Sequence, residues 1–153
     1  MPSPAKVSPR SSRKQLVLCI DDDKKALHLR KLVLEAAGYD VIMASSGRTG
    51  LRLLERHPVR LVILDYRMPE MDGEAVAREI RRTHPHVPTL MLSGQIDVPR
   101  RAASAVDAFV AKGQPPAVLL GHLTALGCGR LGKHPPPTFG TRALELRKKA
   151  GRA

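Results

Sequence analysis

The stretch LVILDYRMPEMDG, residues 61–73, carries the strongest signal for the fold of this chain. It opens with four apolar residues, Leu61 to Leu64, and turns at Asp65 to a segment with proline, acids and glycine. A short run that is apolar at every position is typical of a strand that a parallel sheet buries on both faces. The stretch therefore predicts a buried strand that ends in a carboxylate.

Four further apolar runs alternate with helical patterns along the chain. The runs cover residues 16–20, 41–44, 89–92 and 108–111, and the helical patterns cover residues 24–37, 47–57, 73–83, 99–105 and 115–126. Five strand–helix repeats predict an α/β fold: a five-stranded, doubly wound parallel sheet with right-handed crossovers and helices on both faces. The helix expected at 24–37 ends at Gly38, and its buried face is expected to carry Ala26, Leu29, Val33 and Ala36.

The composition is that of a small soluble protein. The chain has 153 residues, enough for one compact domain, and 42% of them are hydrophobic. It has no run of about 18 apolar residues and no apolar leader near its start, so we expect a cytoplasmic protein. Two cysteines exclude a disulfide framework and a cysteine zinc site. Cys19, within an apolar run, is expected to pack as a small hydrophobic residue.

The formal net charge of +12 is concentrated at the two ends of the chain. Residues 1–14 carry four basic residues and no acid, and residues 128–153 carry seven basic residues and one acid. Residues 15–127 are nearly neutral, with 15 basic and 13 acidic residues. We therefore expect one domain at 15–127 between disordered basic tails, with a candidate short helix at 141–150. Nucleic acid or another anionic partner would bind through these tails.

Polar residues follow four of the five predicted strands. Asp21, Asp22 and Asp23 follow the first strand and Asp65 the third, while Ser93 and Lys112 follow the fourth and fifth. The carboxyl ends of parallel strands meet at one edge of a sheet, which is where ligands bind in such folds. The sequence thus predicts several carboxylates, a hydroxyl and an ammonium group at one site.

This combination of groups suits phosphoryl transfer. Neighbouring carboxylates repel one another, and Mg²⁺, which prefers one or two carboxylates plus waters and phosphate oxygens, relieves that repulsion. Lys112 would pair first with Asp65 and then with a phosphoryl oxygen, and the Ser93 hydroxyl would donate to another. Asp65 would then act as the nucleophile.

Four segments match the pattern of one protein family. They are CIDDD at 19–23, LDYRMPEMDG at 64–73, LSG at 92–94 and FVAK at 109–112. Together they resemble the receiver domains of response regulators, the CheY-like family of two-component phosphorelay signalling, over roughly residues 15–126. The resemblance implies a flavodoxin-like (βα)5 fold with strand order 2-1-3-4-5.

The resemblance also implies a role for each acidic residue of the site. Asp65 matches the phosphoacceptor. Asp22 matches a direct Mg²⁺ ligand, and Asp21 matches a neighbour that acts on the metal largely through water. The backbone carbonyl of Arg67 matches a third protein ligand. Asp23 is more consistent with a helix N-cap, because it directly precedes a helical pattern. Asp72 is expected to start the third helix in the same way.

The same resemblance assigns the remaining site residues. Ser93 and Lys112 match the phosphoryl-binding pair, and Phe109 matches the aromatic switch residue that moves inward when Ser93 shifts toward the phosphate. Arg67 and Gln95 occupy positions that tune phosphate lifetime in the family. We hypothesise that Arg67 reaches over the phosphate and alters attack by water; the alternative is a solvated surface arginine.

Four features depart from the family pattern. Gly113 stands where the family usually has a proline after its lysine, so a cis bond is not assumed. Ser93 replaces the commoner threonine, and Phe109 lacks a tyrosine hydroxyl, so any switch works by packing. The segment from Ser93 to Phe109 is about one helical turn short, so the fourth helix, at 99–105 with Pro99 in its first turn, is expected to be short or displaced.

The expected function is a stand-alone receiver. It would take a phosphoryl group from a histidine kinase or phosphotransfer protein onto Asp65, with Mg²⁺, and signal through protein–protein contacts. Its chemistry would be limited to its own phosphorylation and dephosphorylation, so it is not expected to be an enzyme acting on a separate substrate. The 26 residues after Gly127 are too few for a typical output domain.

Three other functions remain open at this point. Asp21 and Asp23 form a D-x-D pattern, which would suit a Mg²⁺-dependent phosphohydrolase with Asp21 as nucleophile, although only one acid, Glu145, follows Lys112. An adaptor would bind nucleic acid through the basic tails. A docking module would keep the receiver fold and never use phosphate.

Overall fold

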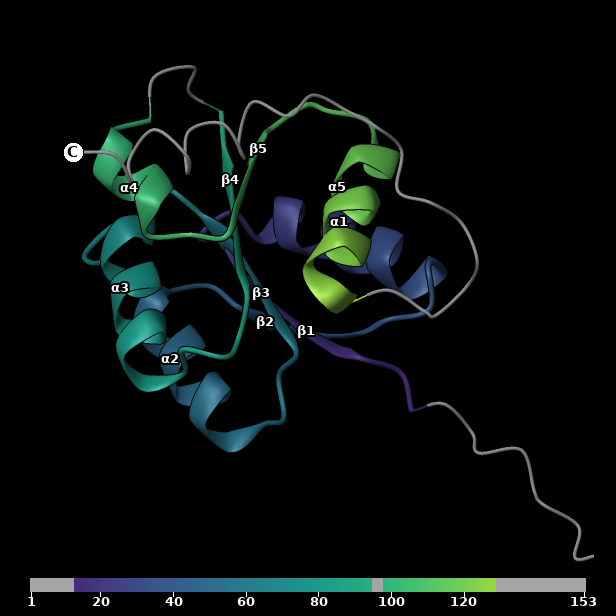
Figure 1. The fold of residues 1–153 in the computed structure, drawn as a ribbon. Coiled ribbons are helices and arrows are strands. Elements are labelled where there is room, and N and C mark those ends of the chain that lie inside the picture. Colours follow the sequence, from purple (N-terminus) through teal and green to yellow (C-terminus); the bar gives the residue numbers. More distant parts are fainter. Residues whose placement is uncertain (1–12, 95–97, 129–153) are drawn as a thin grey trace, which may run out of the picture.

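The computed structural model describes residues 13–94 and 98–128, which form one parallel sheet with helices on both sides (Figure 1). The sheet has five strands in the order β2-β1-β3-β4-β5, and every neighbouring pair is parallel. The strands are β1 (Leu16–Ile20), β2 (Asp40–Ala44), β3 (Leu61–Asp65), β4 (Thr89–Ser93) and β5 (Ala108–Ala111). The predicted strand order is confirmed.

The helices are divided between the two faces of the sheet. In Figure 1, α1 (Lys24–Ala36) and α5 (Pro116–Leu123) cover one face, and α2 (Gly47–Arg56), α3 (Gly73–Thr83) and α4 (Arg100–Ser104) cover the other. Two apolar clusters fill the spaces between these layers. The central strand β3 contributes to both clusters, since Leu61 and Ile63 point to one side and Val62 and Leu64 to the other. This alternation explains why the run is apolar at every position.

The buried face predicted for α1 is wrong. The structure buries Leu27, Arg30 and Leu34, whereas Leu29 and Leu32 are each 65% exposed. The expected stripe, Ala26, Leu29, Val33 and Ala36, includes no fully buried residue. Hydrophobicity alone would not place an arginine on the inner face, but here Arg30 lies beside the buried carboxylate of Asp21, which offsets the burial of its charge.

The ends of the helices follow the sequence closely. The side chain of Asp23 accepts hydrogen bonds from the backbone N–H groups of Lys25 and Ala26, and Asp72 accepts one from Ala75. Both aspartates are therefore N-caps, as predicted. Helix α1 ends at Ala36, and Gly38, two residues later, has a φ of 95°, in the left-handed region that glycine adopts readily.

The last two helices are short. Helix α4 has five residues and begins directly after Pro99, which confirms that this region is shortened. Helix α5 ends at Leu123, and the chain then forms the π-helical turn η1 (Thr124–Cys128). The sequence predicts Cys128 in the C-terminal tail, but it is 2% exposed and packs in the cluster beneath α1 and α5, so this residue belongs to the folded part.

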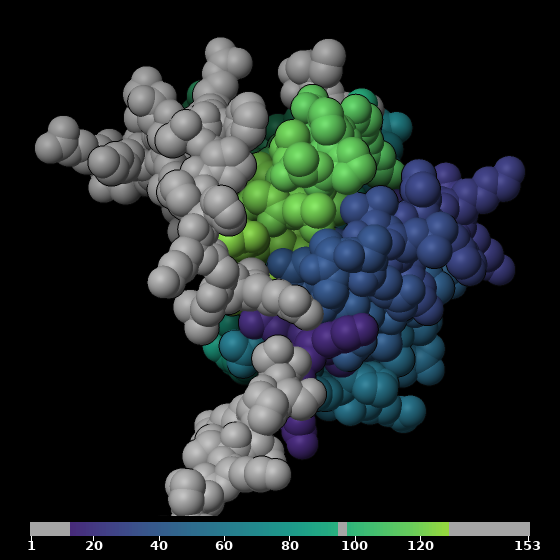
Figure 2. All heavy atoms as spheres, turned by 90° about the vertical axis from the view of Figure 1, so that its right-hand side faces the viewer, coloured from purple at the N-terminus to yellow at the C-terminus, as the bar shows by residue number. Residues whose placement is uncertain are grey.

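Helices α1 and α5 lie side by side on the face shown in Figure 2, with α5 in green and α1 in indigo to blue. The predicted tails, apart from Arg13, Lys14 and Cys128, and the predicted helix at 141–150 lie outside the described residues. Among the residues the structure describes, no helix has the length and apolar composition needed to cross a membrane.

Cys19 is fully buried in β1, and burial raises the pKa of its thiol to about 12. We expect iodoacetamide at pH 8 to label Cys19 of the native protein at least ~100-fold more slowly than in urea, because both access and thiolate are lacking. A Cys128→Ser background isolates the measurement by mass spectrometry. Native labelling as fast as unfolded labelling would contradict the buried position.

Candidate functional site

The carboxyl ends of β1, β3, β4 and β5 bring the predicted polar residues to one edge of the sheet. Asp21 directly follows β1, Asp65 ends β3, Ser93 ends β4 and Lys112 directly follows β5. The strand register aligns these ends, since Ile20 lies opposite Leu64, Asp65 opposite Leu92 and Ser93 opposite Ala111. The topology thus assembles side chains separated by up to 91 positions in the sequence.

Lys112 bridges the two buried carboxylates of the site. Its Nζ atom lies 2.7 Å from Asp65 Oδ1 and 3.5 Å from Asp21 Oδ2. The same Asp21 oxygen lies 3.3 Å from a terminal nitrogen of Arg30. Arg30 was not predicted as a residue of this site. Its only signal in the sequence is its position, nine residues after Asp21 in the helix that follows the first strand.

Three carboxylates form a group that fits a hard cation. Oxygen atoms of Asp21, Asp22 and Asp65 all lie within 4.8 Å of one another. Asp21 and Asp65 are buried and Asp22 is exposed, so solvent reaches the group from the Asp22 side. A set of carboxylate oxygens open to water suits Mg²⁺, which usually keeps several waters. Asp23 is absent from this group, consistent with its use as an N-cap.

The surroundings shift the pKa values of both Asp65 and Lys112. Burial raises the pKa of the Asp65 carboxyl group, the hydrogen bond from Lys112 lowers it in part, and the charge of Asp21 adds to the rise. Partial burial works to lower the pKa of the Lys112 ammonium group, but its hydrogen bond and attraction to Asp65 outweigh burial and raise it. Lys112 is therefore protonated at neutral pH. A further cation close to Asp65 would favour the ionised form of its carboxyl group.

The loop after Asp65 closes tightly against the end of β3. The backbone N–H of Gly73 donates to the carbonyl of Tyr66 at 2.8 Å, and Tyr66 N–H donates to the carbonyl of Leu92 at 3.0 Å. A Cβ atom at Gly73 would collide with the backbone carbonyl oxygen of Asp65 and with Cα of Tyr66. The glycine at 73 is thus required by the close approach of α3 to the residue that bears the central carboxylate.

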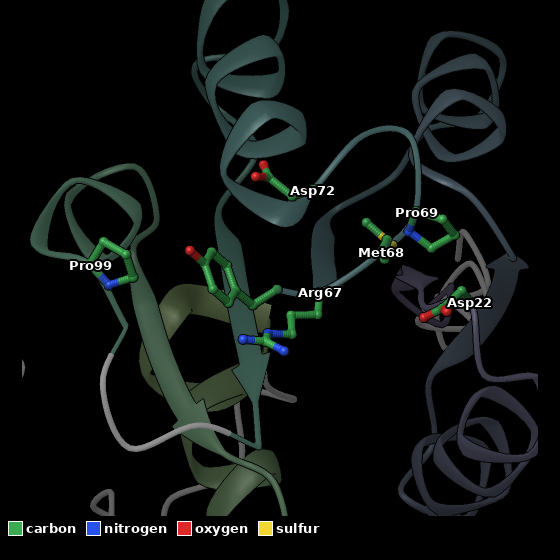
Figure 3. A pocket seen from close by; sticks show the side chains of 7 residues that line it. Asp22, Arg67, Met68, Pro69, Asp72 and Pro99 are labelled. Carbon is green, nitrogen blue, oxygen red and sulfur yellow. The ribbon is translucent and has the colours of Figure 1, made fainter.

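A hollow of about 680 Å³ opens beside the carboxylates (Figure 3). Asp22 lies toward one side of it and Pro99 toward the other, with the exposed side chain of Arg67 between them. Its lining residues are Asp22, Tyr66, Arg67, Met68, Pro69, Asp72 and Pro99. A molecule that enters this hollow therefore meets the carboxylate of Asp22 and the guanidinium group of Arg67.

The remaining predicted site residues, apart from Gln95, lie near the same edge of the sheet. Ser93 is 2% exposed, and its carbonyl accepts the backbone N–H of Lys112 at 2.8 Å. Phe109, in β5, is half-buried against the cluster beneath α2, α3 and α4. The Lys112–Gly113 bond is trans, and Gly113 has a φ of 86°. Gln95 lies outside the described residues.

Residues 17–124 match the family model described as the response regulator receiver domain. The chain belongs to the response regulator receiver family. Receivers are signalling phosphoacceptors that take phosphate from histidine kinases or phosphotransfer proteins and bind Mg²⁺ at an acidic pocket. The fold expected from the resemblance, and the acidic group at its sheet edge, agree with this membership.

Relatives of this receiver include longer regulators. It is 42% identical over 88 residues to the transcriptional regulatory protein GlrR of Escherichia coli K12, covering 58% of this chain and 20% of that protein. It is 34% identical over 103 residues to a probable transcriptional regulator, ycf27, of Galdieria sulphuraria, covering 65% and 40%. The chain therefore spans less than half the length of these relatives.

Solved structures agree with the fold. The chemotaxis protein CheY4 of Vibrio cholerae has 27% sequence identity and a TM-score of 0.68, covering 74% of this chain and 98% of that one. A receiver from Methanospirillum hungatei has 23% identity and a TM-score of 0.70, covering 89% and 98%, and supports the fold alone.

Proposed function

We propose that this receiver accepts a phosphoryl group on Asp65, with Mg²⁺, from a histidine kinase or phosphotransfer protein. The observation that carries the proposal is the contact of 2.7 Å between Lys112 Nζ and Asp65 Oδ1 inside a group of three carboxylates. The contact puts a protonated amine beside the Asp65 carboxylate. From there it can pair with an oxygen of the arriving phosphoryl group as negative charge develops on that oxygen.

The transfer step uses side chains at this edge together with the donor histidine and Mg²⁺. An Asp65 carboxylate oxygen attacks phosphorus, the phosphorus–nitrogen bond of the donor histidine breaks, and the electron pair returns to the imidazole. Lys112 and the Ser93 hydroxyl bind oxygens of the transferring group. Asp22 and Asp65, with the Arg67 carbonyl, would hold Mg²⁺, which neutralises charge on the phosphoryl oxygens when bound. Asp21 would act on the metal mainly through water.

The response to phosphorylation is proposed from the same residues. Ser93 ends β4 and Phe109 lies in β5, so a shift of the serine toward phosphate would be relayed to the half-buried ring. The face that changes would be formed by α4, β5 and α5. The tuning role of Arg67 and Gln95, the stand-alone organisation, and binding of anionic partners by the basic tails stay predictions.

The geometry favours Asp65 over Asp21 as the nucleophile. Asp21 is 0% exposed and its Oδ2 atom lies near both Arg30 and Lys112, so an attacking role would require it to leave two cations. This arrangement counts against the phosphohydrolase alternative. A docking module without phosphate would not need the Lys112–Asp65 contact.

Incubation with acetyl phosphate and Mg²⁺ should add the mass of one phosphoryl group to the full chain, measured by intact-mass spectrometry. Asp65→Asn should abolish the gain, because the amide is a poor nucleophile and a poor metal ligand. Asp40→Asn, an exposed carboxylate at the start of β2, is the matched control and should label as wild type. Unlabelled wild type, or equal labelling of Asp65→Asn, would overturn the proposal.

A further inference from the structure

Arg30 is a buried cation that the proposed phosphoryl transfer does not use. Its side chain is 9% exposed, on the inner face of α1 between Leu27 and Leu34. One terminal nitrogen lies 3.3 Å from Asp21 Oδ2, and the other, Nη1, is buried without a hydrogen-bond partner among the described residues. The guanidinium group therefore reaches the acidic edge without all its donors being satisfied.

Stability alone does not account for this arrangement. A buried ion pair is often no more stabilising than apolar residues of similar volume, and a buried donor without a partner is unfavourable. Both neighbours of Arg30 on the inner face are leucines that pack in the cluster beneath α1, so the position would accommodate an apolar side chain. The arginine differs from such a residue chiefly in the positive charge it brings to Asp21.

That charge changes the balance of the site. Asp21, Asp22 and Asp65 supply three negative charges, and Lys112 and Arg30 supply two positive ones, which leaves a net charge of −1. With a neutral residue at 30 the net charge would be −2. A divalent cation would then be attracted more strongly, and Asp21 would have one fewer cation holding its carboxylate.

We propose that Arg30 is a built-in counter-cation that holds Asp21 away from direct Mg²⁺ ligation and lowers the Mg²⁺ affinity of the unphosphorylated site. Mg²⁺ then binds firmly only together with phosphoryl oxygens. Arg30 also keeps Asp21 paired when Lys112 turns from Asp21 to the phosphoryl group. The inference rests on the proposed function, and Arg30 acts as a positioning residue.

Calorimetric titration of the full-length protein with MgCl₂, without phosphodonor, tests the proposal. Arg30→Leu should bind Mg²⁺ at least about tenfold more tightly than wild type. The reason is that repulsion between a divalent ion and a neighbouring unit positive charge weakens binding by about this factor even in a high-dielectric medium. Arg30→Lys keeps the charge and should stay close to wild type. Lys25→Gln removes an exposed charge from the same helix and should change affinity little.

The double variant Asp21→Asn/Arg30→Leu separates charge from ligation and removes both members of the buried pair, which protects the fold. Its net site charge equals that of wild type, so its Mg²⁺ affinity should lie within about threefold of wild type. A large loss of affinity would mean that Asp21 is a direct ligand and would overturn the inference. Equal affinities of Arg30→Leu and wild type would do the same.

Thermal melting supplies a second measurement in case Arg30→Leu is destabilised. Since a ligand that binds only the folded state stabilises it, added Mg²⁺ should raise the melting temperature of Arg30→Leu more than that of wild type. An equal rise would overturn the role of Arg30. Absence of Mg²⁺ binding in every variant, including wild type, would instead overturn the proposed metal-dependent function together with this inference.

Discussion

Replacing Lys112 by methionine is expected to slow phosphoryl transfer from acetyl phosphate to Asp65 about 100-fold, the loss typical when one charge-stabilising donor is removed from a transition state. Lys112 Nζ is 2.7 Å from Asp65 Oδ1, and no other cation among the described residues forms an ion pair with Asp65. The rate of mass gain at saturating Mg²⁺ measures the effect.

Methionine preserves most of the length of the lysine side chain, so the change isolates its charge and donors. Lys31→Met is the matched control, because this α1 lysine pairs only with Glu35 at 3.7 Å among the described residues. Lys31→Met should transfer at the wild-type rate. Lys112→Arg should recover part of the rate, since it restores the charge with different hydrogen-bond geometry. A Lys112→Met rate near wild type would remove Lys112 from the mechanism.

Gly73→Ala is expected to lower the free energy of unfolding by about 2 kcal/mol, in the range for overpacking of a closely packed site. The new Cβ would meet the carbonyl oxygen of Asp65 and Cα of Tyr66, which are backbone atoms and cannot rotate away. This effect exceeds the gain of up to about 1 kcal/mol that alanine normally brings over glycine in a helix. Urea unfolding followed by circular dichroism measures the change.

Gly94→Ala is the control for Gly73→Ala. A Cβ at Gly94 would have no heavy atom of the described residues within 4 Å, so the unfolding free energy should change by less than about 0.5 kcal/mol. Because the collision at Gly73 involves Asp65 itself, Gly73→Ala should also reduce phosphoryl acceptance where the fold persists. Unchanged stability and transfer would show that α3 can move away from β3 freely.

Much of the fold could be predicted because its signals are local. The runs at 16–20 and 108–111 and the helix at 73–83 match β1, β5 and α3 at both ends. Asp23 and Asp72 mark helix starts through short-range hydrogen bonds to backbone N–H groups two or three residues later. Each of these features depends on neighbouring residues, so the sequence alone contains it.

The inner face of α1 and the burial of Cys128 could not be predicted in the same way. Which side of α1 is buried depends on how the helix sits on the sheet, and Arg30 is buried because Asp21 meets it there. Cys128 is buried because η1 returns to the cluster beneath α1 and α5. Partners from distant positions decide both, and no hydrophobic pattern describes them.

The sequence by itself determined the five strand–helix repeats, the order of polar residues at the strand ends, and membership of the receiver family through the Asp65-to-Gly73 string. Only the tertiary structure decided that Lys112 also reaches Asp21, that Arg30 joins the site from α1, and that Gly73 packs directly against the Asp65 backbone. The physical reason is that charge balance and close packing at this edge depend on distances across the sheet, which the order of residues does not specify.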